Sequence, residues 1–254
     1  MIIAFALVAM MFGLVVGSFL NVCIHRLPLR ESVVWPASRC PHCRALVSPG
    51  DNIPVLSYLM LRGRCRSCGA PISLQYPIIE LATGVVFGAA SLLFAPPLLY
   101  ARLVFACAMI VLFVIDLEHR ILPDRITLPG IVLGFLLSFF LPPGWRDSAI
   151  GIVLGGGSLW LMGEIYFRVR GEEGMGFGDV KMLAMIGAFL GWKLMLLTLV
   201  LSSAIGSVVG VGMIALKRGD MKYALPFGTF LAIGALIAAA VGDRIVNWYS
   251  SLYY

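Results

Sequence analysis

Two aspartates lie at the edges of strongly apolar segments, where a carboxylate is energetically costly. Asp116 directly follows the apolar run MIVLFVI, and Asp179 lies in the glycine-rich stretch EGMGFGDVKM at 173–182, next to another apolar run. Ionisable residues at such depth in a membrane protein are candidates for function. Two neighbouring carboxylates cannot both ionise easily, so one keeps a proton while the other acts as a base. The pair is therefore suited to acid–base activation of water.

Two glycines precede the second aspartate. Gly176 and Gly178 permit backbone conformations and close approaches that other residues do not, so we expect them to bring Asp179 toward Asp116. Two other interpretations of this stretch are open. One is a flexible loop that ends in an N-cap aspartate. The other is a phosphate-binding glycine loop, which is disfavoured because no Lys-Ser/Thr follows and no strand precedes it.

Asp124 is a further carboxylate in the same polar turn as Asp116, VIDLEHRILPDRITLPG at 114–130. It follows Pro123, and the favoured interpretation is an N-cap for a helix that starts near Thr127. The alternative is a supporting role in an active-site turn.

Four cysteines form a second group with the spacing C-x2-C-x21-C-x2-C. They are Cys40 and Cys43 in CPHC, and Cys65 and Cys68 in CRSC. This spacing is close to that of four-thiolate zinc sites, whose two halves are usually about 15–20 residues apart. We therefore predict one structural zinc ion, which would hold together a polar loop too short to fold around its own core.

The alternative for these cysteines is a pair of redox-active CxxC motifs. That chemistry needs a thioredoxin-like fold, which the loop cannot supply. His42, inside the first motif, is interpreted as a bystander. Cys23 and Cys107 lie in apolar segments and are interpreted as small hydrophobic residues.

The elements that position these groups are membrane helices. The chain has 254 residues, of which 60% are apolar and 13% charged, and a mean hydropathy of +0.97. Soluble domains are about 45–50% apolar and about 25% charged. The apolar runs are continuous rather than alternating, which disfavours strands. We predict an all-α polytopic membrane protein, with about eight spans of roughly 20 residues: 1–24, 78–96, 98–115, 127–142, 148–167, 180–192, 194–215 and 225–247.

The first span, and the junction of the sixth and seventh spans, have distinctive local sequences. The first lacks the basic start and the small-x-small cleavage site of a signal peptide, so we expect it to be retained. Only Gly191–Trp192–Lys193 separates the sixth span from the seventh.

Basic residues set the orientation. With eight spans, fifteen Lys and Arg residues fall on one side of the membrane and four on the other. The richer side is expected to be cytoplasmic. The loop 25–77, with its four cysteines, then faces the cytoplasm, and both termini lie outside. This topology accounts for the net charge of +6 without a nucleic-acid partner.

Six sequence features in order resemble the bacterial prepilin peptidases, also called type IV leader peptidases. They are GSFLNVCIHRLP (17–28), the two CxxC motifs, YPIIELATG (76–84), DLEHRILPD (116–124), GMGFGDVKM (174–182) and LPFGTFLAIGA (225–235). The resemblance covers essentially the whole chain. Presenilin-like intramembrane proteases share the glycine-x-glycine-aspartate turn but not the cysteine loop. Thr229 is a departure, because proline is expected after the glycine of PFG.

The resemblance implies a function. It implies an aspartic endopeptidase of the bacterial inner membrane, with Asp116 and Asp179 as the catalytic pair. The substrates would be prepilin-like subunits of type IV pili and type II secretion systems, whose basic leader is removed at the cytoplasmic face. Residues 1–82 would form a methylase-associated region and 83–254 the peptidase domain.

The resemblance also implies N-methylation of the new N-terminus with S-adenosylmethionine. No strand–glycine–helix fingerprint of a Rossmann-type site is visible. We therefore expect a methyl-donor site of another kind, shared between the loop and the membrane face.

Three alternatives remain. The nearest is a peptidase without methylase activity. A zinc-stabilised transporter would have internal repeats and charges near the midplane, whereas no repeat is visible and both aspartates lie at the edge. A structural assembly factor would have no reason to pair carboxylates.

Overall fold

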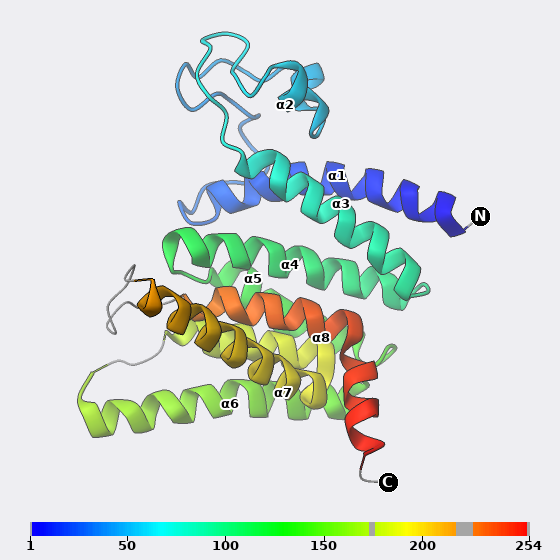
Figure 1. Ribbon diagram of the computed structural model, residues 1–254, viewed down its shortest axis with the longest axis vertical. Helices are drawn as coiled ribbons and strands as arrows, with labels where there is room; N and C mark the ends of the chain where they lie inside the picture. The colour runs from blue at the N-terminus through cyan, green and yellow to red at the C-terminus, as the bar shows by residue number, and fades with distance from the viewer. Residues whose placement is uncertain (1, 173–175, 217–225, 253–254) are drawn as a thin grey trace. The chain divides into compact units, whose positions relative to one another are not determined.

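The structure is a computed structural model, and it describes residues 2–172, 176–216 and 226–252. Within these ranges every regular element is helical (Figure 1). The helices are α1 (Ile2–Arg26), α2 (Leu56–Met60), α3 (Gln75–Leu93), α4 (Leu98–His119), α5 (Asp124–Leu137), α6 (Trp145–Arg170), α7 (Phe177–Ala215) and α8 (Phe227–Ser250), with a 3-10 turn η1 (Pro49–Asn52).

Six of the described helices are long and apolar enough to cross a membrane: α1, α3, α4, α6, α7 and α8. The predicted all-α polytopic class is therefore confirmed. The count of about eight stays a prediction, because α5 has only 14 residues and α7 covers two predicted spans in 39 residues. The break expected after the sixth span is present at Gly191, whose φ of 75° and ψ of 172° interrupt α7.

The chain forms two compact units, residues 1–99 and 100–254. The boundary predicted between residues 82 and 83 falls inside α3. In the first unit α1 packs along α3. A methyl group on Gly17 would lie 2.7 Å from the Cα of Glu80, so small residues allow the two backbones to approach closely. Asn21 of α1 also donates from Nδ2 to the carbonyl of Tyr76 at 3.1 Å.

In the second unit α7 packs against α5, α6 and α8 (Figure 1). Residues 182–191 of α7 are buried, and α7 supplies half of the buried core, which also includes Phe105 and Met109 of α4 and Leu231 of α8. Ser148 of α6 donates to the carbonyl of Ala188 at 2.8 Å. The part of α7 that directly follows Asp179 is therefore packed firmly within its unit.

Candidate active site and metal site

Asp116 lies in the last turn of α4 and is 5% exposed. Its Oδ2 accepts hydrogen bonds from the backbone N–H of Thr229 at 2.6 Å and from the Thr229 hydroxyl at 3.0 Å. Pro226 is the N-cap of α8, so the N–H of Thr229 is one of the first-turn donors that have no partner within the helix. A carboxylate at this position satisfies that donor and also meets the positive end of the helix dipole.

Gly228 allows this contact. A methyl group on Gly228 would lie 3.0 Å from Asp116 Oδ2 and 3.0 Å from Leu122 Cδ1, so a larger residue would push the start of α8 away from the carboxylate. Sequence reasoning did not assign a role to Gly228 and noted Thr229 only as a departure. The sequence feature that could have drawn attention to Gly228 is the Pro-Phe-Gly turn directly before an apolar helix.

Asp179 is half-buried in the first turn of α7, where its N–H donates to the carbonyl of Gly176 at 3.1 Å. Gly178, the residue before it, packs against Leu122, and Leu122 also lies against Gly228 beside the Asp116 carboxylate, so the two aspartates lie around the same side chain. The structure therefore brings together the two aspartates singled out in the sequence. Asp116 comes from the end of α4 and Asp179 from the start of α7. The start of α8 donates a hydrogen bond to the Asp116 carboxylate.

The two glycines differ in how the chain uses them. Gly176 has a φ of −71°, which any residue can adopt, so backbone freedom is not used there. At Gly178 the missing side chain matters, because a methyl group would lie 2.9 Å from the Cβ of Leu122. Gly178 thus allows the first turn of α7 to pack against the turn that follows α4.

The N-cap interpretation of Asp124 was wrong. Helix α5 begins at Asp124 rather than near Thr127, its N-cap is Pro123, and the cap makes no side-chain hydrogen bond. The Asp124 carboxylate instead accepts from Lys181 Nζ at 2.5 Å. This ion pair joins the first turn of α5 to the first turns of α7, which fits the alternative of a supporting role beside Asp179.

The four cysteines of the loop converge. Their Sγ atoms all lie within 4.8 Å of one another, with 3.9 Å between Cys40 and Cys68 and 4.0 Å between Cys43 and Cys65. Tetrahedral zinc with Zn–S bonds of about 2.3 Å requires S···S separations of about 3.8 Å. The donor set therefore fits one zinc ion, and His42 is not part of the cluster.

Each CxxC motif has the same backbone geometry. The N–H of Cys40 donates to the carbonyl of Ala45 at 2.9 Å, and the N–H of Cys65 donates to that of Ala70 at 2.8 Å. Each motif is followed by a residue with positive φ: 59° at Arg44, and 72° at the glycine after Cys68. Such tight turns direct both sulfurs of a motif toward a single point.

Backbone hydrogen bonds from Cys43 and His42 lower the pKa of the Cys40 thiol to about 6. Thiolates are the form that binds metal, so Cys40 is favoured in the form of a metal ligand, whereas burial and the neighbouring thiols raise the pKa of Cys68 to about 11. Within the second motif, Arg66 donates to both carboxylate oxygens of Asp51, at 2.6 to 3.1 Å. That hydrogen-bonded guanidinium lowers the pKa of Asp51.

The fold and these groups define a multi-pass membrane protein with a carboxylate pair where three helices begin or end, and a cluster of four cysteines that could hold a metal ion. Two family models match the chain: the bacterial peptidase A24 N-terminal domain over residues 11–94, and the type IV leader peptidase family over 103–211. No solved structure matches significantly.

Near full-length relatives are called prepilin leader peptidase/N-methyltransferase. That of Aeromonas hydrophila is 40% identical, over 94% of this chain and 91% of its own. Those of Stutzerimonas stutzeri and Pseudomonas aeruginosa are 38% and 39% identical, each over 97% of this chain and 94% of its own. The chain belongs to the type IV leader peptidase family.

Proposed function

We propose that this protein removes the leader from prepilin-like subunits and N-methylates the new N-terminus. The observation that carries the proposal is the similarity, over almost the entire chain, to proteins named for both activities. Prepilins or pseudopilins in the membrane are the substrate class. S-adenosylmethionine, when bound, supplies the methyl group, which replaces a proton on the amine as the S–CH₃ bond breaks.

Asp116 and Asp179 are the catalytic pair in this proposal. Two donors on Asp116 Oδ2 favour the ionised carboxylate, and its other oxygen takes a proton from the attacking water. Asp179 protonates the scissile carbonyl as the water oxygen bonds to its carbon. When the C–N bond breaks, the proton on Asp116 passes to the leaving amine and Asp179 recovers its own.

Thr229 positions Asp116 in this mechanism. Its N–H and its hydroxyl both donate to that carboxylate, whereas the proline that the family resemblance leads us to expect here has neither donor. Hydrogen bonds to charged groups contribute about 1.5–3 kcal/mol. We therefore expect Thr229→Val, which removes the hydroxyl donor, to lower kcat for leader removal by about tenfold to a hundredfold with KM little changed.

The control for this prediction is Thr198→Val. Thr198 is equally buried, but its hydroxyl donates to Leu194 within α7 at 2.8 Å, away from Asp116. Thr229→Ser keeps both donors and should retain most of the activity. An unchanged kcat in Thr229→Val would contradict the role of Thr229 in positioning Asp116. Equal losses in Thr229→Val and Thr198→Val would also contradict it, because they would point to a general effect of losing a buried hydroxyl.

We propose that the protein lies in the bacterial inner membrane, with its active site on the cytoplasmic side. The distribution of basic residues, fifteen against four, supports this side. The leader of a prepilin would meet the carboxylates there, where the substrate's apolar helix leaves the membrane.

Membrane vesicles that carry the protein and a prepilin test the reaction and its side together. In inverted vesicles, whose outer face is the cytoplasmic one, the free leader should appear outside, and in right-side-out vesicles it should stay inside. Cleavage should persist with a metal chelator, because a closed four-thiolate zinc site leaves no position for a catalytic water. An intact prepilin in both preparations would contradict the peptidase, and leader release on the opposite side would contradict the orientation.

The mass of the mature subunit tests the second activity. With S-adenosylmethionine supplied, the product should gain one methyl group at its N-terminus. A cleaved product that stays unmethylated would reduce the function to that of a peptidase alone.

A further inference from the structure

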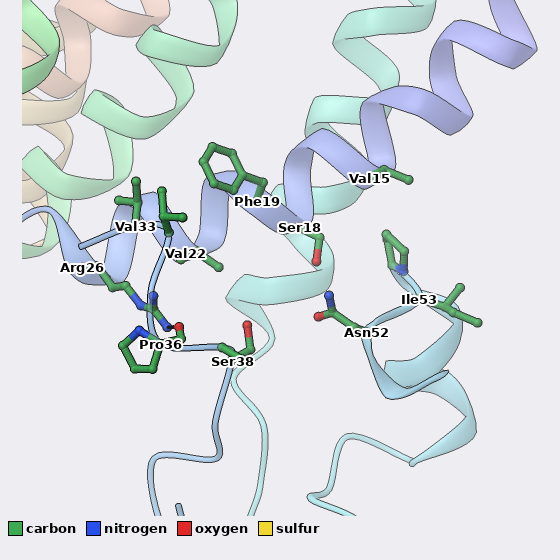
Figure 2. Close-up of a pocket in the computed structure, with 13 residues that line it drawn as sticks. Val15, Ser18, Phe19, Val22, Arg26, Val33, Pro36, Ser38, Asn52 and Ile53 are labelled. Carbon is green, nitrogen blue, oxygen red and sulfur yellow. Dashed lines mark hydrogen bonds between the residues drawn. The ribbon is translucent and has the colours of Figure 1, made fainter. Parts of the chain in front are cut away.

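A cavity of about 540 Å³ lies in the first unit, between α1 and two segments of the loop that follows it. Figure 2 shows Phe19 and Val22 along α1, and Ser38 and Asn52 on the loop segments that complete the lining. Of the 13 described residues that line the cavity, only Arg26 is charged. Most of the other lining side chains are apolar, so the cavity is suited to an apolar ligand that carries a negative charge.

The cavity lies on the outer face of α1. Val15, Phe19 and Val22 follow one another at spacings of four and three residues, so they share one face of the helix. Two residues turn a helix by about 200°, so Gly17 lies on the opposite face from Val15, and Gly17 packs against α3. The face that lines the cavity therefore points away from α3, and its Val15 and Phe19 side chains are 58% and 50% exposed. Because α1 is long and apolar enough to cross a membrane, we expect this face to meet lipid.

The wall of the cavity changes from apolar to charged along the axis of α1. Arg26 is the last residue of the helix, and Val15 lies eleven residues before it, about 16 Å along the axis. One leaflet of a bilayer has about the same apolar depth, because the whole hydrocarbon core is about 30 Å thick. Arginines near the ends of membrane helices extend their charge to the interface. A lipid whose chain lies along Val15 and Phe19 therefore presents its headgroup to Arg26.

The loop completes the cavity with apolar side chains that the protein leaves uncovered. Val34 is 81% exposed and Ile53 is 47% exposed, and both line the cavity. Arg26 fixes the first loop segment, because it donates to the carbonyls of Ser32 at 3.0 Å and Pro36 at 2.8 Å. A guanidinium has five N–H donors, and none of the ion pairs among the described residues involves Arg26. The arginine can therefore hold the wall and still bind an anion.

We propose that this cavity binds one anionic phospholipid, with an acyl chain along the outer face of α1 and the phosphate beside Arg26. Charge complementarity identifies the ligand, since basic pockets beside membrane helices bind anionic headgroups. Ser38 and Asn52 supply hydrogen-bonding groups for the phosphate and ester oxygens. A small anion would leave the apolar wall uncovered, and a cationic ligand would face Arg26 with no carboxylate in the lining to balance its charge. The proposal is independent of the peptidase and methylase activities.

Native mass spectrometry of the full-length, zinc-loaded protein in detergent micelles tests the site, with phosphatidylglycerol and phosphatidylcholine as the two probes. The wild type should bind one phosphatidylglycerol about fivefold more tightly than phosphatidylcholine, the usual effect of one basic residue on an anionic lipid. Val15→Trp and Val22→Trp each place a bulky ring in the cavity without removing a wall hydrogen bond, and each should weaken that binding about tenfold. Arg26→Gln should remove the preference for phosphatidylglycerol. Arg26→Lys should retain most of it, because the charge stays.

Matched controls separate the cavity from the rest of the surface. Val8→Trp adds the same ring to the same face of α1, seven residues before Val15 and outside the cavity. Arg30→Gln removes an exposed charge that follows α1 but does not line the cavity. Both variants should bind phosphatidylglycerol like the wild type. Zinc content and monodisperse elution report folding, and if Arg26→Gln loses its zinc, the two tryptophan variants decide the site.

Four results would overturn the proposal. Equal affinities of the wild type for the two lipids, or a preference that survives in a folded Arg26→Gln variant, would show that Arg26 does not bind the headgroup. Unchanged phosphatidylglycerol binding in both Val15→Trp and Val22→Trp would place the lipid elsewhere on the protein. Displacement of phosphatidylglycerol by inorganic phosphate would show a site for a small anion instead of a lipid.

Discussion

Replacing Asp116 or Asp179 with asparagine is expected to abolish leader removal, lowering the rate by about 10²–10⁴-fold in each variant, the usual contribution of one acid–base group. Asparagine has nearly the same shape and can still accept the bonds from Thr229 at its carbonyl oxygen. It can neither take a proton from water nor give one to a carbonyl. The loss should therefore appear in kcat rather than in folding. Rates of leader release from a prepilin in nanodiscs are the measurement.

Asp124→Asn is the matched control for this prediction. Asp124 is more than half exposed, and its pair with Lys181 is of the partly solvated kind that contributes up to about 1 kcal/mol. This variant should lose no more than about fivefold in rate. All three variants should keep their zinc and insert into the membrane. Near-normal cleavage by Asp116→Asn or Asp179→Asn would overturn the assignment of the catalytic pair.

The groups that sequence reasoning found were those whose presence is costly without a purpose. A carboxylate directly after the apolar run MIVLFVI is energetically costly, and four cysteines in two CxxC motifs form a recognisable spacing. Both features can be seen in the local sequence alone. The break in α7 was visible for the same reason, since Gly191 interrupts an otherwise continuous apolar run.

The roles that sequence reasoning missed depend on partners far along the chain. Thr229 and Asp116 are 113 residues apart, and no local pattern joins them. Asp124 satisfied a local rule for helix N-caps, yet its carboxylate pairs with Lys181, 57 residues away. Gly178 was noted for backbone freedom and close approach, but its partner in that close approach, Leu122, was not predicted. Packing between helices decides such roles, and a single sequence does not display it.

Replacing Cys40 or Cys65 with serine is expected to remove the zinc and unfold the loop between α1 and α3. Of the residues from 27 to 74 whose burial is described, only Cys40 and Gly63 are buried. The loop therefore has almost no apolar core to stabilise it. Binding of zinc to structural sites provides about 10–16 kcal/mol at pH 7, and where no core exists this is the free energy of folding.

Elemental analysis should find one zinc ion per chain in the wild type and much less than one in either cysteine variant. Limited proteolysis of the variants in nanodiscs should cut between residues 27 and 74 while the membrane helices stay intact, because their packing does not involve the metal. His42→Ala is the matched control within the first motif, since His42 lies between Cys40 and Cys43 but outside the cluster. It should keep its zinc and its resistance to protease. Protein purified under reducing conditions without zinc, or a Cys65→Ser loop as resistant as the wild type, would contradict a structural metal site.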